Sequence, residues 1–183
     1  MMDNIKFREA VLADARTLAE MHLASWRHCY GHLLCKQWLD SPAAQTERIQ
    51  YWEHALRTGK KRIELAMCGD RPIALSEADR VPDADGEAFL DNLHVLPGWQ
   101  GQGLGQALLV RLLDALHGKT GARTLALTVV EDNQPARGFY RAKGGHEKAE
   151  GVHRYGDGSV LTLLRVEWRD LPVLRADLAR AAA

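Results

Sequence analysis

The sequence contains no apolar run that approaches the ~20 residues needed to cross a bilayer, and its first residues lack the apolar segment of a secretory signal. It has no excess of either charge, because Lys plus Arg and Asp plus Glu both number 24. No global field therefore favours a nucleic acid or an anionic membrane surface as a partner. We expect a cytoplasmic protein that binds neither nucleic acid nor membrane.

Cysteine is also scarce. Cys29, Cys35 and Cys68 make an odd number without a Cys-x-x-Cys pair, which argues against a disulfide framework and for reduced thiols. His28 and His32 stand beside two of these cysteines and would share a face if the segment were helical. A glycine interrupts the segment and zinc-site spacing is missing, so a polar loop on the substrate side is favoured over a metal site. We expect no metal ion.

What is present fits one globular domain, since 183 residues with 46% hydrophobic and 26% charged are ordinary for a single core. Alternation and turn residues predict strands at 5–8, 62–67, 72–78, 88–95, 124–130, 146–154 and 160–168. Helical spacing predicts helices at 15–30 (capped by Asp14), 42–58, 103–116 and 135–143. This order predicts a mixed α/β sheet with helices on both faces, in one domain over residues 1–170. Residues 171–183 form an Ala- and Arg-rich tail whose order the sequence leaves open.

The most informative stretch, residues 95–105, joins a predicted strand to a predicted helix through a glycine-rich turn. Unpaired N–H groups and the helix dipole favour an anion there, and glycines let a phosphate come close. Leu104 follows Gly103 where a Walker A loop needs Lys, and the alternating glycines in mid-chain do not match a dinucleotide fingerprint. We expect a ligand with a phosphate or pyrophosphate, and we expect a Cβ at Gly103 or Gly105 to occupy its space.

Two motifs carry a resemblance to a known family. Gln100, Gly103 and Gly105 match the pattern Gln/Arg-x-x-Gly-x-Gly/Ala, and residues 133–140 match Asn-x-x-Ala-x-x-Phe-Tyr. Together they resemble the GCN5-related N-acetyltransferases (GNAT), and the resemblance covers residues 5–168. It is weaker before residue 87.

The resemblance implies the GNAT fold, with a mostly antiparallel central sheet of about six to seven strands. It implies that acetyl-CoA is the co-substrate, and that its acetyl group moves to a primary amine of a small molecule or peptide by direct attack. The strands at 88–95 and 124–130 would splay apart to admit the pantetheine arm. Members often form dimers, so a homodimer is compatible with the resemblance, although no feature of the sequence marks an interface.

The cofactor-binding residues that the resemblance implies lie in three groups. Backbone groups of the first strand would bind the pantetheine and the acetyl carbonyl, amides of the turn would bind the pyrophosphate, and the later motif would flank the thioester. The set is Leu93, His94, Val95, Gln100, Gly101, Gln102, Gly103, Leu104, Gly105, Asn133, Ala136, Phe139, Tyr140 and Lys143. Asn133 also suits a helix start, Phe139 suits packing, and Lys143 suits either a ribose phosphate or the helix dipole.

The chemistry requires an acid for the thiolate and a base for the amine. Tyr140 occupies the family's position for the acid, although it also suits a core hydroxyl. Many members carry a glutamate base where this chain has Phe89. We rank Asp91, then Glu87, which share the strand parity of that position, and then His94, which could act through water. Each has an equally good structural interpretation.

The acceptor side is predicted in the first two helices. Trp26 and Tyr30 lie four residues apart and would share a helix face that could line an amine pocket, although core packing is the default for such a pair. Two other functions stay open. One is a non-catalytic acyl-CoA-binding module that lost its base, and the other is an acyltransferase with a different acyl donor or an O-linked acceptor.

Overall fold

The computed structural model describes residues 4–117 and 121–180. The strands are β1 (Ile5–Glu9), β2 (Lys61–Cys68), β3 (Arg71–Asp79), β4 (Glu87–Val95), β5 (Thr124–Val130), β6 (His146–Arg154) and β7 (Val160–Trp168). The α-helices are α1 (Ala15–Tyr30), α2 (Lys36–Leu39), α3 (Pro42–Thr58), α4 (Leu104–Leu116), α5 (Gln134–Arg141) and α6 (Leu171–Arg180). The predicted strands and helices are all present, and the short helix α2 was not predicted.

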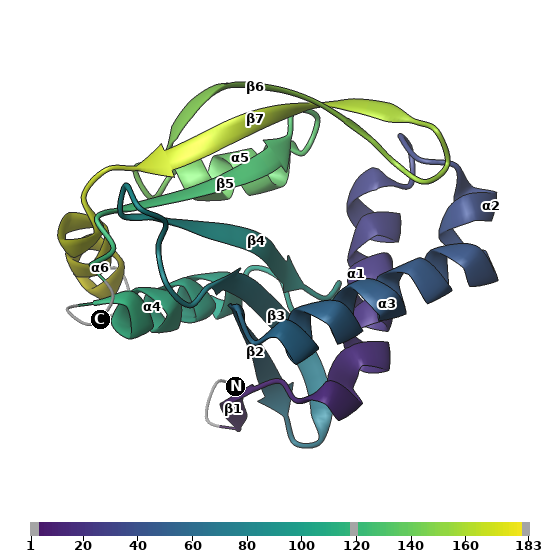
Figure 1. The fold of residues 1–183 in the computed structure, drawn as a ribbon, viewed down its shortest axis with the longest axis horizontal. Helices are drawn as coiled ribbons and strands as arrows, with labels where there is room; N and C mark the ends of the chain where they lie inside the picture. Colours follow the sequence, from purple (N-terminus) through teal and green to yellow (C-terminus); the bar gives the residue numbers. More distant parts are fainter. Residues whose placement is uncertain (1–3, 118–120, 181–183) are drawn as a thin grey trace.

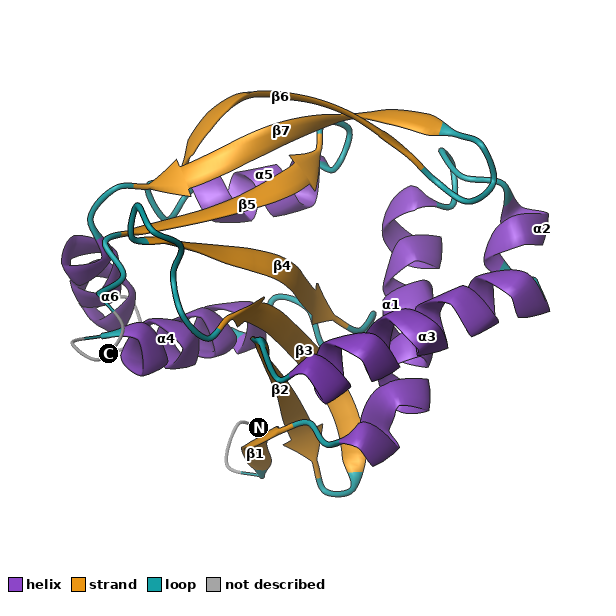
Figure 2. Ribbon diagram, in the orientation of Figure 1, coloured by secondary structure: helices purple, strands orange, loops and turns teal. Residues whose placement is uncertain are grey.

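The strands form one sheet in the order β1-β2-β3-β4-β5-β7-β6 (Figure 1). Neighbouring strands are antiparallel except for β4 and β5, which are parallel. Helices α1 and α3 pack their apolar side chains on one face of β2 and β3, and α4 packs on the other face (Figure 2). The predicted mixed, mostly antiparallel sheet with helices on both faces is confirmed.

Local signals explain where the first helices begin. The Ser41 hydroxyl accepts a hydrogen bond from the Ala44 N–H at 3.1 Å and caps α3, which ends at Gly59 in the left-handed conformation with φ 62°. Asp14 stands at the predicted N-cap position of α1, but its side chain makes no capping hydrogen bond to the helix. Its carboxylate instead accepts from the Val11 N–H and pairs with Arg8, each at 2.7 Å, because a 3-10 turn at Leu12–Asp14 precedes the helix.

The segment after β7 forms α6, which lies against α4 (Figure 1). Leu171, Leu174 and Leu178 are buried in the cluster that α4 shares with β4, β5 and β7. The Gln106 side chain donates to the Leu178 carbonyl at 2.9 Å. Helix α6 therefore packs into the core of the predicted domain, residues 1–170. The last residues of the predicted tail, 181–183, lie outside the described residues.

The middle of the sheet opens. β4 and β5 pair over three positions, from Glu87 opposite Thr124 to Phe89 opposite Ala126, and beyond them the strands diverge (Figure 1). The splay that the family resemblance implies is therefore present. Apolar side chains of β4 and β5 pack together with α4 where the two strands are paired. Beyond the paired positions, the edges of β4 and β5 face each other across the gap.

A β-bulge interrupts β4 at the point where the strands separate. Ala78 of β3 pairs with Leu90 and Glu77 pairs with Asn92, so Asp91 is the extra residue. Leu90 and Leu93 consequently both pack on the α4 side. The even alternation that placed Glu87 and Asp91 on one face of the strand does not continue through this position. Among the described residues, no helix is long and apolar enough to cross a membrane.

Candidate active site

A cavity of about 920 Å³ occupies the gap between β4 and β5. Its wall includes both diverging strands, the glycine turn, α5, and residues of α1 and α3. Of the residues predicted as catalytic, cofactor-binding or substrate-binding, all line it except Gln102 and Glu87. The fold thus brings together the two sequence motifs, which are some thirty residues apart in the chain.

The glycine turn presents its backbone to the cavity. Backbone N–H groups from Gln100 to Gly105 donate to no acceptor within residues 4–117 and 121–180. The Gln100 and Gln102 side chains brace the turn itself, because they donate to the carbonyls of Val95 at 3.2 Å and Gly98 at 3.1 Å. Clustered, unpaired amides before α4 are what a pyrophosphate requires. The turn therefore fits the pyrophosphate of coenzyme A.

The two motif glycines have different physical roles. Gly103 has φ 80°, and a Cβ built on it meets no atom within 4 Å, so its environment is open to a ligand. A Cβ on Gly105 would lie 3.4 Å from the Phe139 ring. A Cβ on Gly105 would therefore make an ordinary contact with the Phe139 ring, and the prediction that it would occupy phosphate space stays a prediction.

Helix α5 brings the second motif to the cavity. The Asn133 side chain caps α5 by accepting from the Ala136 N–H at 3.2 Å, and its amide donates to the Tyr30 hydroxyl at 3.0 Å. Burial raises the pKa of Tyr30 to about 12. Asn133 thus links α5 to α1, so that the two sides of the cavity are held together. Its helix-start role is present in the structure.

Tyr140 lies in the cavity wall with 7% of its surface exposed. Its ring makes T-shaped contacts with Phe139 and Trp168, at centroid distances of 5.3 and 5.9 Å. Its hydroxyl has no hydrogen-bond partner in the described part of the chain, and burial raises its pKa. The phenol therefore stays protonated and keeps an O–H free to donate into the cavity. The Lys143 ammonium lies 4.3 Å from the Phe139 ring centroid, and burial lowers its pKa.

The two carboxylates that were ranked first as bases are both engaged in ion pairs. Glu87 pairs with Arg165 of β7, away from the cavity. Asp91 lines the cavity, but Lys61 binds it at 2.6 Å and also binds Asp79 at 2.8 Å. Burial raises the pKa of Asp91, and Lys61 opposes this shift. The structure therefore does not bring Glu87 to the site, and it gives Asp91 a cationic partner.

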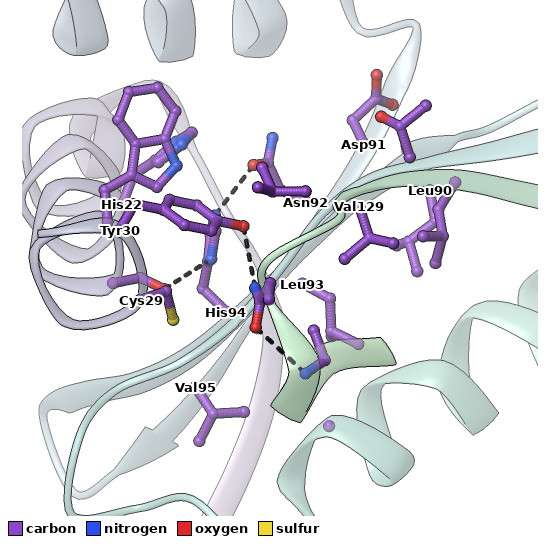
Figure 3. A pocket seen from close by; sticks show the side chains of 18 of the residues that line it. His22, Cys29, Tyr30, Leu90, Asp91, Asn92, Leu93, His94, Val95 and Val129 are labelled. Atoms are coloured by element: carbon purple, nitrogen blue, oxygen red, sulfur yellow. Dashed lines mark hydrogen bonds between the residues drawn. The ribbon is translucent and has the colours of Figure 1, made fainter. Parts of the chain in front are cut away.

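His94 is differently placed. Its Nδ1 lies 2.9 Å from the Ser25 hydroxyl. Its Nε2 lies 3.0 Å from the Asn92 side-chain oxygen (Figure 3). The His22 ring packs against it with a centroid distance of 4.7 Å. Burial lowers the pKa of His94 to about 4, so the imidazole is neutral at pH 7. Sequence reasoning missed Ser25 and Asn92, since neither residue stands in a recognisable motif.

The predicted substrate residues, Trp26 and Tyr30, both line the cavity. The Trp26 ring stacks on Trp38 with centroids 6.1 Å apart and meets Tyr155 edge-on at 5.3 Å. The Arg48 guanidinium lies 5.1 Å over Trp26. Sequence reasoning missed Arg48 and Tyr155, because neither stands in a motif and Tyr155 follows β6, far along the chain from α1. Within residues 4–117 and 121–180, no group of three or more His, Cys, Asp or Glu side chains is arranged to hold a metal ion.

Comparison with known proteins agrees with this geometry. Residues 18–144 match the model of the acetyltransferase (GNAT) family. A probable N-acetyltransferase of Mycobacterium tuberculosis is 31% identical over 146 residues, which cover 78% of this chain and 80% of that protein. The ribosomal protein bS18 alanine N-acetyltransferase of Escherichia coli is 46% identical over 61 residues, which cover 33% of this chain and 40% of the relative.

The fold is also shared with solved structures. The PaiA N-acetyltransferase of Thermoplasma acidophilum in complex with coenzyme A superposes with a TM-score of 0.70 at 19% identity, covering 90% of this chain and 99% of that one. The match of the family model spans both motifs and the cavity between them. The chain therefore belongs to the GNAT family of acetyltransferases.

Proposed function

We propose that the cavity between β4 and β5 is the site where this acetyl-CoA-dependent N-acetyltransferase brings its thioester and its amine acceptor together. The transfer of an acetyl group from acetyl-CoA to an amine is the activity of the family. The observation that supports this site is the row of unpaired N–H groups from Gln100 to Gly105 at the edge of the cavity. Those amides would bind the pyrophosphate.

The free edge of β4 explains how the rest of the co-substrate would be held. Pairing with β5 ends at Phe89, so within residues 4–117 and 121–180 the β4 edge from Leu90 to Val95 has no strand partner on that side. An extended pantetheine arm can hydrogen-bond to such an edge as an added strand would. We assign Leu93 and Val95 to this role. Asn133, Ala136 and Lys143 would flank the arm from α5 and its end.

Tyr140 and His94 are our choices for acid and base. Tyr140 lines the cavity, and since its hydroxyl has no hydrogen-bond partner among the described residues, it can donate to the leaving sulfur. His94 is preferred to Asp91 and Glu87, because its imidazole is neutral and lies in the cavity wall, whereas Lys61 neutralises Asp91 and Glu87 lies elsewhere. Direct attack by the amine needs no covalent enzyme intermediate.

The acceptor would enter beside Trp26 and Tyr30. The wall there is rich in aromatic rings, which suit an amine of a small molecule or a peptide end, and Glu47 and Arg48 beside them pair with each other at 2.6 Å. Relatives named for a ribosomal-protein alanine and for spermidine illustrate both classes. We further propose a single domain over residues 1–170 extended by α6, acting in the cytoplasm without nucleic acid or membrane; a homodimer is compatible with this.

Thiol release tests the function directly. Calorimetry with acetyl-CoA should show saturable binding, and an amine library should then contain acceptors that release free thiol with matching acetylated product. Binding without thiol release for any amine would favour the non-catalytic module. A mixed panel of acyl-CoA donors with product mass spectrometry would reveal another donor or an O-linked acceptor.

Gly103→Ala tests the pyrophosphate seat. A Cβ at φ 80° is strained and faces the open cavity, so we expect the Kd for acetyl-CoA to rise about 10-fold. Gly98→Ala is the matched control, because Gly98 has φ 85° and open space around its Cβ but does not line the cavity. Its Kd should change less than about 3-fold. Equal weakening by both changes would mean that loop strain, rather than the ligand contact, controls affinity.

A further inference from the structure

A chain of hydrogen bonds leads from the cavity wall into the sheet. The Ser25 hydroxyl of α1 contacts His94 Nδ1 at 2.9 Å, His94 Nε2 contacts Asn92 Oδ1 at 3.0 Å, and Asn92 Nδ2 contacts Glu77 of β3 at 2.6 Å. Ser25 is 5% exposed and Glu77 is 1% exposed. Three elements thus place a serine, a histidine, an amide and a carboxylate in one line.

The direction of each bond follows from the carboxylate at the inner end. Glu77 accepts from the Tyr51 hydroxyl and from Asn92 Nδ2, both at 2.6 Å. With its Nδ2 committed to Glu77, Asn92 turns its oxygen towards His94, so Nε2 of His94 must carry a proton. Nδ1 is then the lone-pair nitrogen, and it accepts from the Ser25 hydroxyl.

The direction of the Ser25–His94 hydrogen bond decides how a proton of the acceptor amine can reach the imidazole. The Ser25 hydroxyl lines the cavity, whereas Nδ1 of His94 is covered by that hydroxyl. A proton that leaves the cavity can therefore reach His94 through Ser25. The pattern of a hydroxyl, an imidazole and an orienting amide or carboxylate is one that proteins use to move protons directionally.

We propose that Ser25 relays the proton of the acceptor amine to His94, and that Asn92 and Glu77 are positioning residues which hold His94 in the accepting tautomer. The inference rests on the proposed function. As the amine nitrogen bonds to the acetyl carbon, its N–H bond breaks and Ser25 Oγ takes that proton, while the original Ser25 proton passes to His94 Nδ1. The C–S bond breaks and Tyr140 gives its proton to the sulfur. Water in the cavity afterwards returns a proton to Tyr140 and removes one from His94.

The charged surroundings of His94 decide how its protonated form is stabilised. Titratable side chains surround it from α1, α3, β3 and its own strand: His22, Cys29, Arg48, Tyr51, Glu77 and Asp91. Arg48 opposes a positive charge in this region, and burial holds the pKa of His22 well below its usual value. Within the described residues, Glu77 is the carboxylate joined to His94 through hydrogen bonds, so it is the group that favours a transient imidazolium.

Nitrogen NMR of the enzyme without an acceptor tests the positioning step. Wild type should show His94 as the neutral tautomer with the proton on Nε2. Glu77→Gln keeps the volume but removes the charge, so His94 should become a mixture of tautomers and kcat should fall about 10-fold, with KM for acetyl-CoA unchanged. A wild-type His94 with its proton on Nδ1 would overturn the relay.

Kinetics test the relay itself. Ser25→Ala should lower kcat about 100-fold without a change in KM for acetyl-CoA, and Ser25→Thr should restore most of the loss because it returns a hydroxyl. Ser76→Ala is the matched control, since Ser76 is a buried serine of β3 outside the cavity. An active wild type whose Ser25→Ala variant is as fast as Ser76→Ala overturns the relay alone. A wild type that releases no thiol with any amine overturns the proposed function, and the relay with it.

Discussion

Tyr140→Phe is expected to lower kcat about 100-fold and to leave the Kd for acetyl-CoA nearly unchanged. The change removes the hydroxyl but keeps the ring contacts with Phe139 and Trp168, so the wall of the cavity should hold its shape. The lost O–H is the donor that would protonate the leaving sulfur. Steady-state kinetics and calorimetry on the same preparations measure the two quantities.

The pH profile separates an acid from a packing residue. Burial raises the pKa of Tyr140 above the usual value near ~10, so wild type should keep its activity through neutral pH and lose it only under strongly basic conditions. Tyr140→Phe should lack this basic limb. A thermal unfolding midpoint close to that of wild type serves as the folding control. Unchanged turnover at every pH would remove Tyr140 from the acid role.

Short, contiguous motifs could be predicted because their geometry is local. The glycine turn joins a strand to a helix within residues 95–105, and its open amides follow from positive φ angles and from the start of α4. In the same way, Asn133 and the following proline define the start of α5. Neither feature depends on distant parts of the chain.

The sequence could name Asp91, Glu87 and His94 as candidate bases but could not decide among them, because their surroundings depend on pairings between distant segments. The sequence ranking used the even alternation of a strand, and the bulge at Asp91 breaks that alternation. Asp91 also meets Lys61 and Glu87 meets Arg165, contacts that the register of β2 and β7 creates. Glu77 contacts Asn92 because β3 pairs with β4, and no local pattern marks such a contact. The sheet register therefore decides which titratable group stays free.

His94→Gln is expected to lower kcat by about 10² to 10⁴, the usual effect of removing a general base. Gln has a similar length and can still hydrogen-bond to Ser25 or Asn92, so the cavity wall should stay folded. It has no basic nitrogen, so the proton of the amine has no acceptor. The KM for acetyl-CoA should change little, because the loop amides are untouched. Residual activity near that of wild type would return Asp91 to first place among the candidate bases.

The His94→Gln variant also tests how the free energy of unfolding depends on pH. The folded-state pKa of His94 is about 4, below the unfolded value near ~6.5, so the unfolded chain binds the proton first as pH falls. The stability that this neutral imidazole contributes is present above pH ~6.5 and is lost as pH falls towards ~4. The full shift corresponds to about 3 kcal/mol, and because His94 is partly exposed at the cavity wall, solvent screening reduces our expectation to about 2 kcal/mol.

Urea unfolding at pH 7.5 and pH 4.5 measures that loss. Wild type should lose about 2 kcal/mol more than His94→Gln between the two conditions, a difference that includes any change at His22, because the neighbouring His94 helps to hold the pKa of His22 down. His32→Gln is the matched control, because His32 is exposed and should leave the wild-type slope intact. Equal slopes in wild type and His94→Gln would show that His94 is protonated alike in the folded and unfolded chains. The pKa of His94 would then lie near its unfolded value, and burial would not be what sets the protonation state of the imidazole.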